Sequence, residues 1–211
     1  MIDDDRSAGK ASTKERILNA AAELFSSRGY GETTLAEITK LSGVNIALVN
    51  YHYGDKATLY RQTWELLHSQ ALAKYPLYGK LSKSAPAVKR LYEIIRSDIA
   101  RRSDPSIREN DFMMNELSSP TQLMDDLHAR AYAPLRAALQ AAVAEISADR
   151  LSEEDRRMAV LAIFSMCTIP VKHFQNLETE VQNKYDVETR ARYVYNFAMA
   201  GILDMLSRSK K

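Results

Sequence analysis

Two residue pairs in the sequence have a spacing that could place metal ligands on one face of a helix. Glu65 and His68 form an E-x-x-H pair, and Asp125 and His128 form a D-x-x-H pair. Helical bundles that hold two iron ions use two E-x-x-H pairs together with two further inward glutamates, because residues three apart share a helix face. The second pair has aspartate in place of glutamate, and two further inward glutamates are not evident. We therefore predict no metal and no cofactor.

Nucleophilic catalysis is also weakly indicated. The single cysteine, Cys167, lies in an apolar run, where cysteine usually serves as a small buried hydrophobic residue. The sequence contains no G-x-S-x-G, H-E-x-x-H or Gly-rich phosphate-loop motif. We predict that the protein is not an enzyme, with a helical metal-binding enzyme as the alternative from another functional class.

The composition indicates a folded helical protein. Of 211 residues, 45% are hydrophobic and 27% are charged, and the net charge is only +2. The 7 glycines and 6 prolines are few, so turns are few and elements are long, which favours helices. The acidic start lacks the apolar core of a signal peptide, and the apolar stretch 159–171 is shorter than the ~18 residues of a membrane span. We expect a cytoplasmic protein in which residues 1–11 form a flexible acidic tail.

Capping signals divide the N-terminal third into four helices. Capping boxes begin at Ser12 and Thr34, each with a glutamate three residues later. Asn45 and Asp55 are placed to cap the next two helices, and a glycine follows each of the first two. The predicted helices cover residues 12–28, 34–42, 45–51 and 56–74.

The second and third of these helices, with Gly43 in the turn between them, have the spacing of a helix-turn-helix. In such a motif one helix enters the major groove of DNA while the other crosses the backbone. Threonine hydroxyls at a helix start and a lysine such as Lys56 on the other flank can contact phosphates. Any all-α protein can contain a helix, a glycine turn and a helix, so the spacing alone leaves DNA binding and a purely structural role open.

Longer helices are predicted over residues 86–102, 106–117, 121–146, 152–176 and 186–206, with Pro134 as a kink or boundary. The sequence thus predicts an all-α fold with an N-terminal three-helix helix-turn-helix domain and a larger C-terminal helical bundle. The predicted boundaries are 12–55 for the first domain, 56–74 for a connecting helix and 75–211 for the bundle.

The segments TTLAEITKLSGVN (residues 33–45) and YHYGDKATLY (residues 51–60) resemble the DNA-binding domain of TetR/AcrR-type regulators. The resemblance extends from Lys14 to about Leu67, and residues 44–51, VNIALVNY, look most like a subgroup with a VNxAxVNYHFGSK-like recognition helix. It implies a homodimeric regulator with double-stranded DNA, in a palindromic operator, as its partner. The C-terminal bundle resembles the family in length and helix order more than in residues.

Carried over by position, the resemblance implies a set of DNA contacts. Thr33 and Thr34 are expected at the phosphate backbone, and Tyr51, His52 and Lys56 are expected to hold phosphates. For His52, a neutral ring packed at a helix end is the alternative. Many members have a polar residue where this chain has Ile46, so we expect contact with a thymine methyl there and recognition of adenine by Asn50. The residues expected to face bases are Asn45, Ile46, Ala47 and Asn50, with Leu48 close by.

The resemblance also implies a dimer interface and an effector pocket in residues 75–211, the predicted ligand-binding and dimerisation domain. The predicted interface is the apolar face of the last helix: Val194, Phe197, Ala198, Gly201, Ile202 and Met205. The predicted pocket residues are Phe112, Met113, Met114, Met124, His128, Tyr132, Met166, His173 and Phe174. Ordinary core packing is the alternative explanation for both sets.

The sequence therefore predicts a sequence-specific DNA-binding transcriptional regulator, with a repressor released from its operator by a small-molecule effector as the leading form. An activator, or a regulator that needs a co-ligand, is the alternative within the class.

Overall fold

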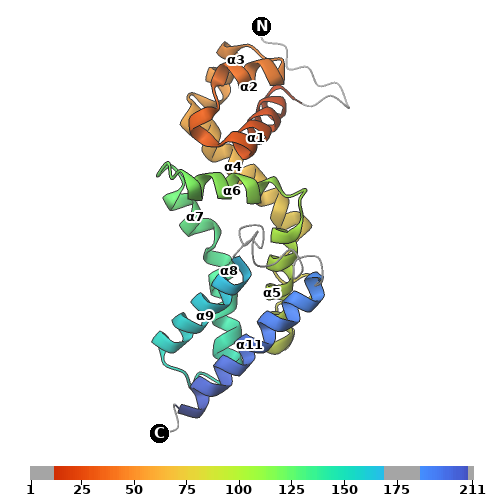
Figure 1. Cartoon of the computed structure of the whole chain (residues 1–211), viewed down its shortest axis with the longest axis vertical. Coiled ribbons are helices and arrows are strands. Elements are labelled where there is room, and N and C mark those ends of the chain that lie inside the picture. The colour runs from red at the N-terminus through yellow and green to blue at the C-terminus, as the bar shows by residue number, and fades with distance from the viewer. Residues whose placement is uncertain (1–11, 169–185, 209–211) are drawn as a thin grey trace, which may run out of the picture. The chain divides into compact units, whose positions relative to one another are not determined.

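A computed structural model describes residues 12–168 and 186–208 of the chain (Figure 1). All of the regular elements in these residues are α-helices, which confirms the predicted all-α class. The chain divides into two compact units. The first contains the described residues up to Ala71 together with 106–128, and the second contains residues 72–105 and those from Ala129 onward. Residues 106–128, which the predicted boundaries assign to the C-terminal bundle, thus lie in the first unit.

Six helices contribute to the first unit. Its core is aromatic: Phe25, Tyr60, Trp64 and Phe112 are each almost completely buried. The helices are α1 (Thr13–Glu32), α2 (Leu35–Ser42), α3 (Ile46–Tyr53), α4 (Lys56–Lys74, as far as Ala71), α6 (Arg108–Ser118) and α7 (Asp125–Ala131, as far as His128).

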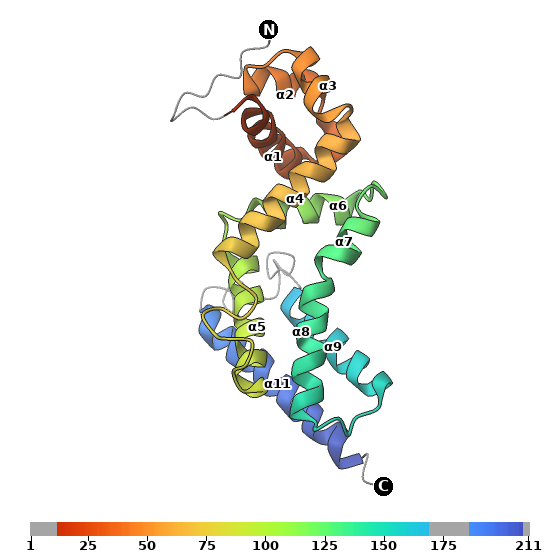
Figure 2. The same cartoon turned by 180° about the vertical axis from the view of Figure 1, so that it is seen from behind.

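The helices of the second unit are α5 (Ala87–Ser103), α8 (Ala133–Ile146), α9 (Glu153–Thr168) and α11 (Val187–Arg208). Helix α5 packs against α8, α9 and α11, and α9 also packs against α8 and α11 (Figure 2). Leu91, Ile95, Leu139, Val143 and Ile202 lie in the shared apolar core. The second unit is therefore a bundle held by side-chain packing.

The predicted helix over 121–146 is wrong at its start and correct in its boundary at Pro134. Thr121 donates its N–H to Glu116 Oε1 at 2.9 Å, and Gln122 has φ +61°, so the chain cannot begin a helix there. Helix α7 begins at Asp125 instead. Tyr132 separates α7 from α8, and Pro134 lies in the first turn of α8, where its missing N–H costs nothing.

Charged side chains are buried in the second unit around Asp98. The Asp98 carboxylate accepts hydrogen bonds from Arg101 Nη2 at 2.7 Å and from Arg102 Nε at 2.9 Å. Burial by itself raises the pKa of Asp98, but the guanidiniums of Arg102 and Arg101 outweigh it and hold the pKa below its usual value. Cys167 is buried as predicted, and burial raises the pKa of its thiol to about 12.

The helices of the described residues include none with the length and apolar character that a membrane crossing requires.

Candidate nucleic-acid interface

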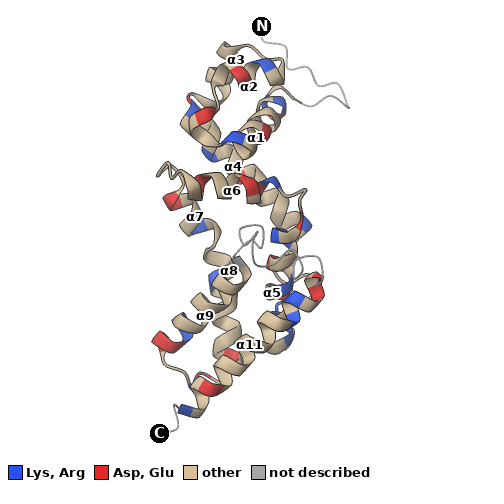
Figure 3. Cartoon of the chain, in the orientation of Figure 1, with Lys and Arg blue, Asp and Glu red and all other residues tan. Residues whose placement is uncertain are grey.

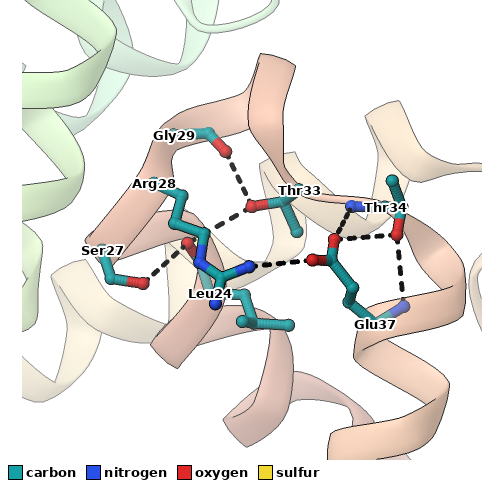
Figure 4. Close-up of polar contacts among 7 residues, drawn as sticks. All are labelled: Leu24, Ser27, Arg28, Gly29, Thr33, Thr34 and Glu37. Atoms are coloured by element: carbon teal, nitrogen blue, oxygen red, sulfur yellow. Dashed lines mark hydrogen bonds and ion pairs between the residues drawn. The ribbon is translucent and has the colours of Figure 1, made fainter.

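The start of α2 is fixed by the predicted capping box (Figure 4). Thr34 Oγ1 accepts the N–H of Glu37 at 3.2 Å and donates to Glu37 Oε2 at 2.8 Å. Glu37 Oε2 also accepts the Thr34 N–H at 2.9 Å. Arg28 Nη1 donates to the other carboxylate oxygen at 2.8 Å. These hydrogen bonds, led by that from the Thr34 N–H, lower the pKa of Glu37. Thr34 is exposed, so it is accessible to a phosphate.

Thr33 has a different environment from its neighbour. Its side chain has no exposed surface, and its hydroxyl lies 2.8 Å from the Gly29 carbonyl oxygen and 3.3 Å from that of Leu24, to which it donates (Figure 4). The prediction that Thr33 contacts the phosphate backbone is therefore wrong for its side chain. Gly29 has φ +76° and breaks the helical path inside α1, so the Thr33 hydroxyl supplies a donor for carbonyls that this break leaves open.

The turn between α2 and α3 is held by an arginine of α1. Gly43 has the left-handed conformation, with φ +64°, that a glycine C-cap favours. Arg16 Nη2 donates to Ser42 O at 2.7 Å and to Gly43 O at 2.9 Å, and its Nε donates to Ser42 O at 3.1 Å. The guanidinium thereby satisfies carbonyls at the end of α2 and fixes the turn relative to α1. No local sequence signal identifies Arg16, because its partners are 26 and 27 residues away.

Helix α3 has one buried side and one exposed side. Val49 and Tyr53 are buried, and the Tyr53 hydroxyl donates to Lys14 O at 2.9 Å. Asn45 caps the helix, with its Oδ1 accepting the Leu48 N–H at 3.0 Å, as predicted. The exposed side contains Ile46, Ala47, Asn50 and Tyr51.

We call these four residues the reading face. Tyr51 is 72% exposed and Ile46 is 46% exposed, although both are large and partly apolar. Helix α3 contains no Lys, Arg, Asp or Glu (Figure 3). Such a face suits the major groove, where an asparagine amide pairs with adenine and an aliphatic side chain contacts a thymine methyl. Charge complementarity to phosphates has to come from neighbouring elements.

The residues predicted at the edges of the reading face are partly covered. Leu48 and His52 are half-buried, and the His52 ring lies 5.1 Å from the Tyr51 ring in an edge-to-face arrangement. Lys56, the first residue of α4, is also half-buried, and its ammonium lies 4.1 Å from the centre of the Tyr30 ring. Burial lowers the pKa of Lys56, and the charge of Glu37 opposes this shift.

Helix α6 is attached to the end of α1 through Asn115, which the sequence analysis did not identify. Asn115 Nδ2 donates to Ser26 O at 2.8 Å and to Phe25 O at 3.3 Å, just before the break at Gly29. Ser26 Oγ in turn donates to Arg108 O at 3.2 Å. An amide from α6 thus serves as a C-cap for the first part of α1, across 89 residues of sequence.

The two residue pairs with metal-ligand spacing are arranged differently from a metal centre. Glu65 is exposed, whereas His68 is buried with its Nδ1 2.6 Å from Glu109 Oε1. Trp64 stacks on His68 at 4.8 Å and meets the His128 ring edge-to-face at 5.1 Å. Burial lowers the pKa of His128, against the effect of the nearby carboxylates. Among the described residues, no three or more His, Cys, Asp or Glu side chains gather as metal ligands do.

The predicted pocket residues do not form one group within either unit. Phe112 packs 4.4 Å from Tyr60 in the core of the first unit, so its side chain is structural, and Met124 is fully buried in the same unit. Met113, Met114 and His128 are partly exposed members of the first unit, and Tyr132 and Met166 belong to the second. His173 and Phe174 lie outside the described residues. In the second unit, a cavity beside Phe164 and Cys167 holds about 10 Å³, room for one water at most.

The predicted dimer face is partly wrong. Ala198 and Ile202 are buried in the core of their own unit, because they point toward α5 and α9 rather than outward. Phe197 is 70% exposed, Gly201 is exposed, and Val194 and Met205 are half-buried. On α9, Met158 and Leu161 are 58% and 55% exposed. The two helices therefore present large apolar side chains to solvent.

The fold and the site define a class of protein: a helix-turn-helix transcriptional regulator with a C-terminal helical domain. The family model "Bacterial regulatory proteins, tetR family" matches residues 17–63. A second model, "HTH-type transcriptional dual regulator CecR, C-terminal domain", matches residues 87–202, which is more than half of the chain. The chain belongs to the TetR family of bacterial regulatory proteins, with a C-terminal domain of the CecR type.

Relatives and solved structures agree with this assignment. The transcriptional regulator AcrR of Shigella flexneri is 40% identical over 57 residues, 27% of this chain and 26% of AcrR. The biofilm operon negative regulator IcaR of Staphylococcus epidermidis is 40% identical over 52 residues, 25% of this chain and 28% of IcaR. The chain thus spans about a quarter of the length of these curated relatives.

The likeness to solved structures extends over most of the chain. The crystal structure of AibR in complex with isovaleryl coenzyme A and operator DNA aligns with a TM-score of 0.66 at 16% identity, covering 88% of this chain and 97% of AibR. At this identity the match establishes a shared fold.

Proposed function

We propose that the protein represses transcription by binding a palindromic operator as a homodimer and leaves the operator when it binds a small molecule. The observation that carries the proposal is the reading face: four side chains exposed on one side of a short helix whose two ends are capped and whose other side is buried. Binding DNA places its site of action in the cytoplasm, and we propose no catalytic activity.

A dimer follows from the size of the reading face. One short helix contacts too few bases for tight recognition, and two such helices must lie about 34–36 Å apart to enter successive major grooves. The exposed apolar side chains of α9 and α11, including Leu161 and Phe197, support these helices as the interface. Large apolar side chains in contact with water favour burial against a second copy.

A small-molecule effector is supported by a structure that shares the fold. AibR was crystallised with both a coenzyme A thioester and its operator.

The test of DNA recognition uses sheared genomic DNA of the source organism. The protein is mixed with it near physiological salt, at a concentration where it is dimeric, and the retained fragments are sequenced. Enrichment of a palindrome supports the proposal. Ala47→Asp places a carboxylate on the reading face and abolishes the enrichment, whereas Ala141→Asp, on the exposed side of α8, leaves it unchanged. A flat profile for the unmodified dimer contradicts the proposal.

Activation is the second candidate function, because the model that matches residues 87–202 is named after a dual regulator. A reporter gene placed behind the enriched operator separates the two. Expression falls when the protein is present if it represses and rises if it activates. Because Trp64 is the only tryptophan, its fluorescence reports effector binding when candidate molecules are added.

A further inference from the structure

Lys56, one of the predicted phosphate contacts, is half-buried beside an aromatic ring. Its ammonium lies 4.1 Å from the centre of the Tyr30 ring, within the range in which a cation is attracted to an aromatic face. A lysine in solution samples many rotamers, and ordering it on binding costs conformational entropy. The Tyr30 ring reduces that cost in advance, and it contacts the ammonium from one side only.

The Tyr30 ring is itself held by neighbouring rings. It meets Tyr60 edge-to-face at 5.0 Å and stacks against Phe25 at 6.3 Å. Tyr60 is almost completely buried, and its hydroxyl donates to Glu116 Oε2 at 2.7 Å. Burial raises the pKa of Tyr60, and the bond to Glu116 raises it further, so Tyr60 remains a donor.

Glu116 is fixed from its other side as well. Its Oε1 accepts the N–H of Thr121 at 2.9 Å and the Thr121 hydroxyl at 2.8 Å. Glu116 lies on α6, and Lys56 begins α4. Within the first unit, an unbroken series of contacts therefore leads from α6 through Tyr60 and Tyr30 to the ammonium of Lys56.

We propose that Tyr30 is a positioning residue that presents the Lys56 ammonium to a DNA phosphate, and that the Tyr60–Glu116 hydrogen bond holds Tyr30 in place. The proposal deepens the proposed function and rests on it, because it concerns the same DNA site. It also makes α6 a controlling element: a change that withdraws Glu116 from Tyr60 weakens the phosphate contact without touching the reading face.

The test measures how operator affinity depends on salt. The salt slope is the steepness with which log K falls as log salt rises. Each lost phosphate contact lowers this steepness by about 0.9, and a symmetric dimer loses two contacts. Lys56→Met removes the contact. Tyr30→Leu removes the ring and lowers the slope in the same direction, whereas Tyr30→Phe keeps the ring and keeps the slope.

A double-mutant cycle separates positioning from general damage to the fold. In the Lys56→Met background, Tyr30→Leu has no further effect on affinity or slope if Tyr30 acts through Lys56. An equal loss in both backgrounds overturns the proposal, as does tighter binding by Tyr30→Leu, which would mean that the ring keeps Lys56 away from DNA. Thermal unfolding of each variant identifies any loss that comes from unfolding.

Two further variants test the bond to Glu116. Tyr60→Phe lowers the salt slope by less than Tyr30→Leu does, because the Tyr30 ring remains and only the hydrogen bond between Tyr60 and Glu116 is lost. Ser118→Ala removes an exposed hydrogen bond of the same helix that does not involve Glu116, and it serves as the matched control, with an unchanged slope. If the unmodified protein selects no DNA sequence, the proposed function fails. If it selects an operator but Lys56→Met leaves the slope unchanged, only the present inference fails.

Discussion

The two units are both helical, but different interactions fix their geometry. In the first unit, short helices are held by side chains that bond to the backbone, such as Thr34 at the start of α2 and Arg16 at its end. In the second, longer helices are held by an apolar core that encloses Asp98 between two arginines. In the first unit, directional bonds add to burial in placing the exposed face of α3, whereas burial of an apolar core places the helices of the bundle. Each unit therefore has its own most sensitive positions.

The largest effect is expected in the core of the second unit. Asp98→Asn removes the buried carboxylate that pairs with the guanidiniums of Arg101 and Arg102, and removing one partner of a buried ion pair costs about 3 kcal/mol or more of unfolding free energy. Asp204→Asn is the matched control, because its exposed ion pair with Arg208 contributes within about 0.5 kcal/mol. Urea unfolding of both variants measures the difference in unfolding free energy, and equal losses would contradict the stabilising role of the buried ion pairs of Asp98.

The difference in unfolding free energy between the unmodified protein and Asp98→Asn depends on pH. The lowered pKa of Asp98 stabilises the fold at every pH above the unfolded carboxyl pKa of about 3.9, and this stabilisation is lost as the pH falls through the lower folded value. The stability gap between the unmodified protein and Asp98→Asn therefore stays constant at neutral pH and narrows below about pH 4. A gap that persists unchanged to the acid limit would show that charge is not its cause.

The next largest effect is expected from a variant that tests whether dimerisation through the bundle increases operator affinity. Phe197→Asp places a charge among exposed apolar side chains of α11 and is expected to yield monomers, with operator affinity reduced by on the order of a hundredfold, about 2.7 kcal/mol. Leu203→Asp alters another exposed apolar residue of the same helix, elsewhere around its axis, and should stay dimeric. Sedimentation measures the oligomeric state of both variants. A dimeric Phe197→Asp protein would show that this face is not the dimer interface.

The smallest effects are expected from two adjacent threonines of the first unit, Thr33 and Thr34. Thr33→Val removes a buried hydroxyl with two carbonyl acceptors, which costs about 1–2 kcal/mol of stability without changing the salt dependence of DNA binding. Thr34→Val removes an exposed N-cap, which costs about 1 kcal/mol and also weakens binding to phosphate. Unfolding and operator titration are measured on the same proteins. Weaker phosphate binding by folded Thr33→Val protein would show that the Thr33 side chain does contact a DNA phosphate.

Interactions between residues close in sequence were predicted correctly more often than interactions between residues far apart in sequence. The capping roles of Thr34, Asn45 and Gly43 were predicted correctly, because each residue acts on partners within four positions of itself. The role of Thr33 was predicted wrongly, because which of two neighbouring threonines is buried depends on carbonyls of α1. Asn115 was missed because its acceptors lie some 90 residues away.

The apolar face of the last helix shows the same limit. Periodicity identified the helix and its apolar residues, but a periodic stripe does not distinguish the side that packs on its own core from the side left for a partner. The structure divides them, with Ile202 inside and Phe197 outside. That division depends on the positions of α5 and α9, and these cannot be deduced from the spacing of residues along one helix.

Under the proposed function, the exposed side of α3 reads bases, while the capped and buried residues around it only hold it in place. The most direct measurement is selection from a randomised DNA pool with the unmodified protein and with Asn50→Ala, each checked to be folded and dimeric. We expect both proteins to select the same palindrome, with the preference for adenine lost at one symmetry-related pair of positions in the variant. Identical preferences at every position would contradict the assignment of base recognition to this face.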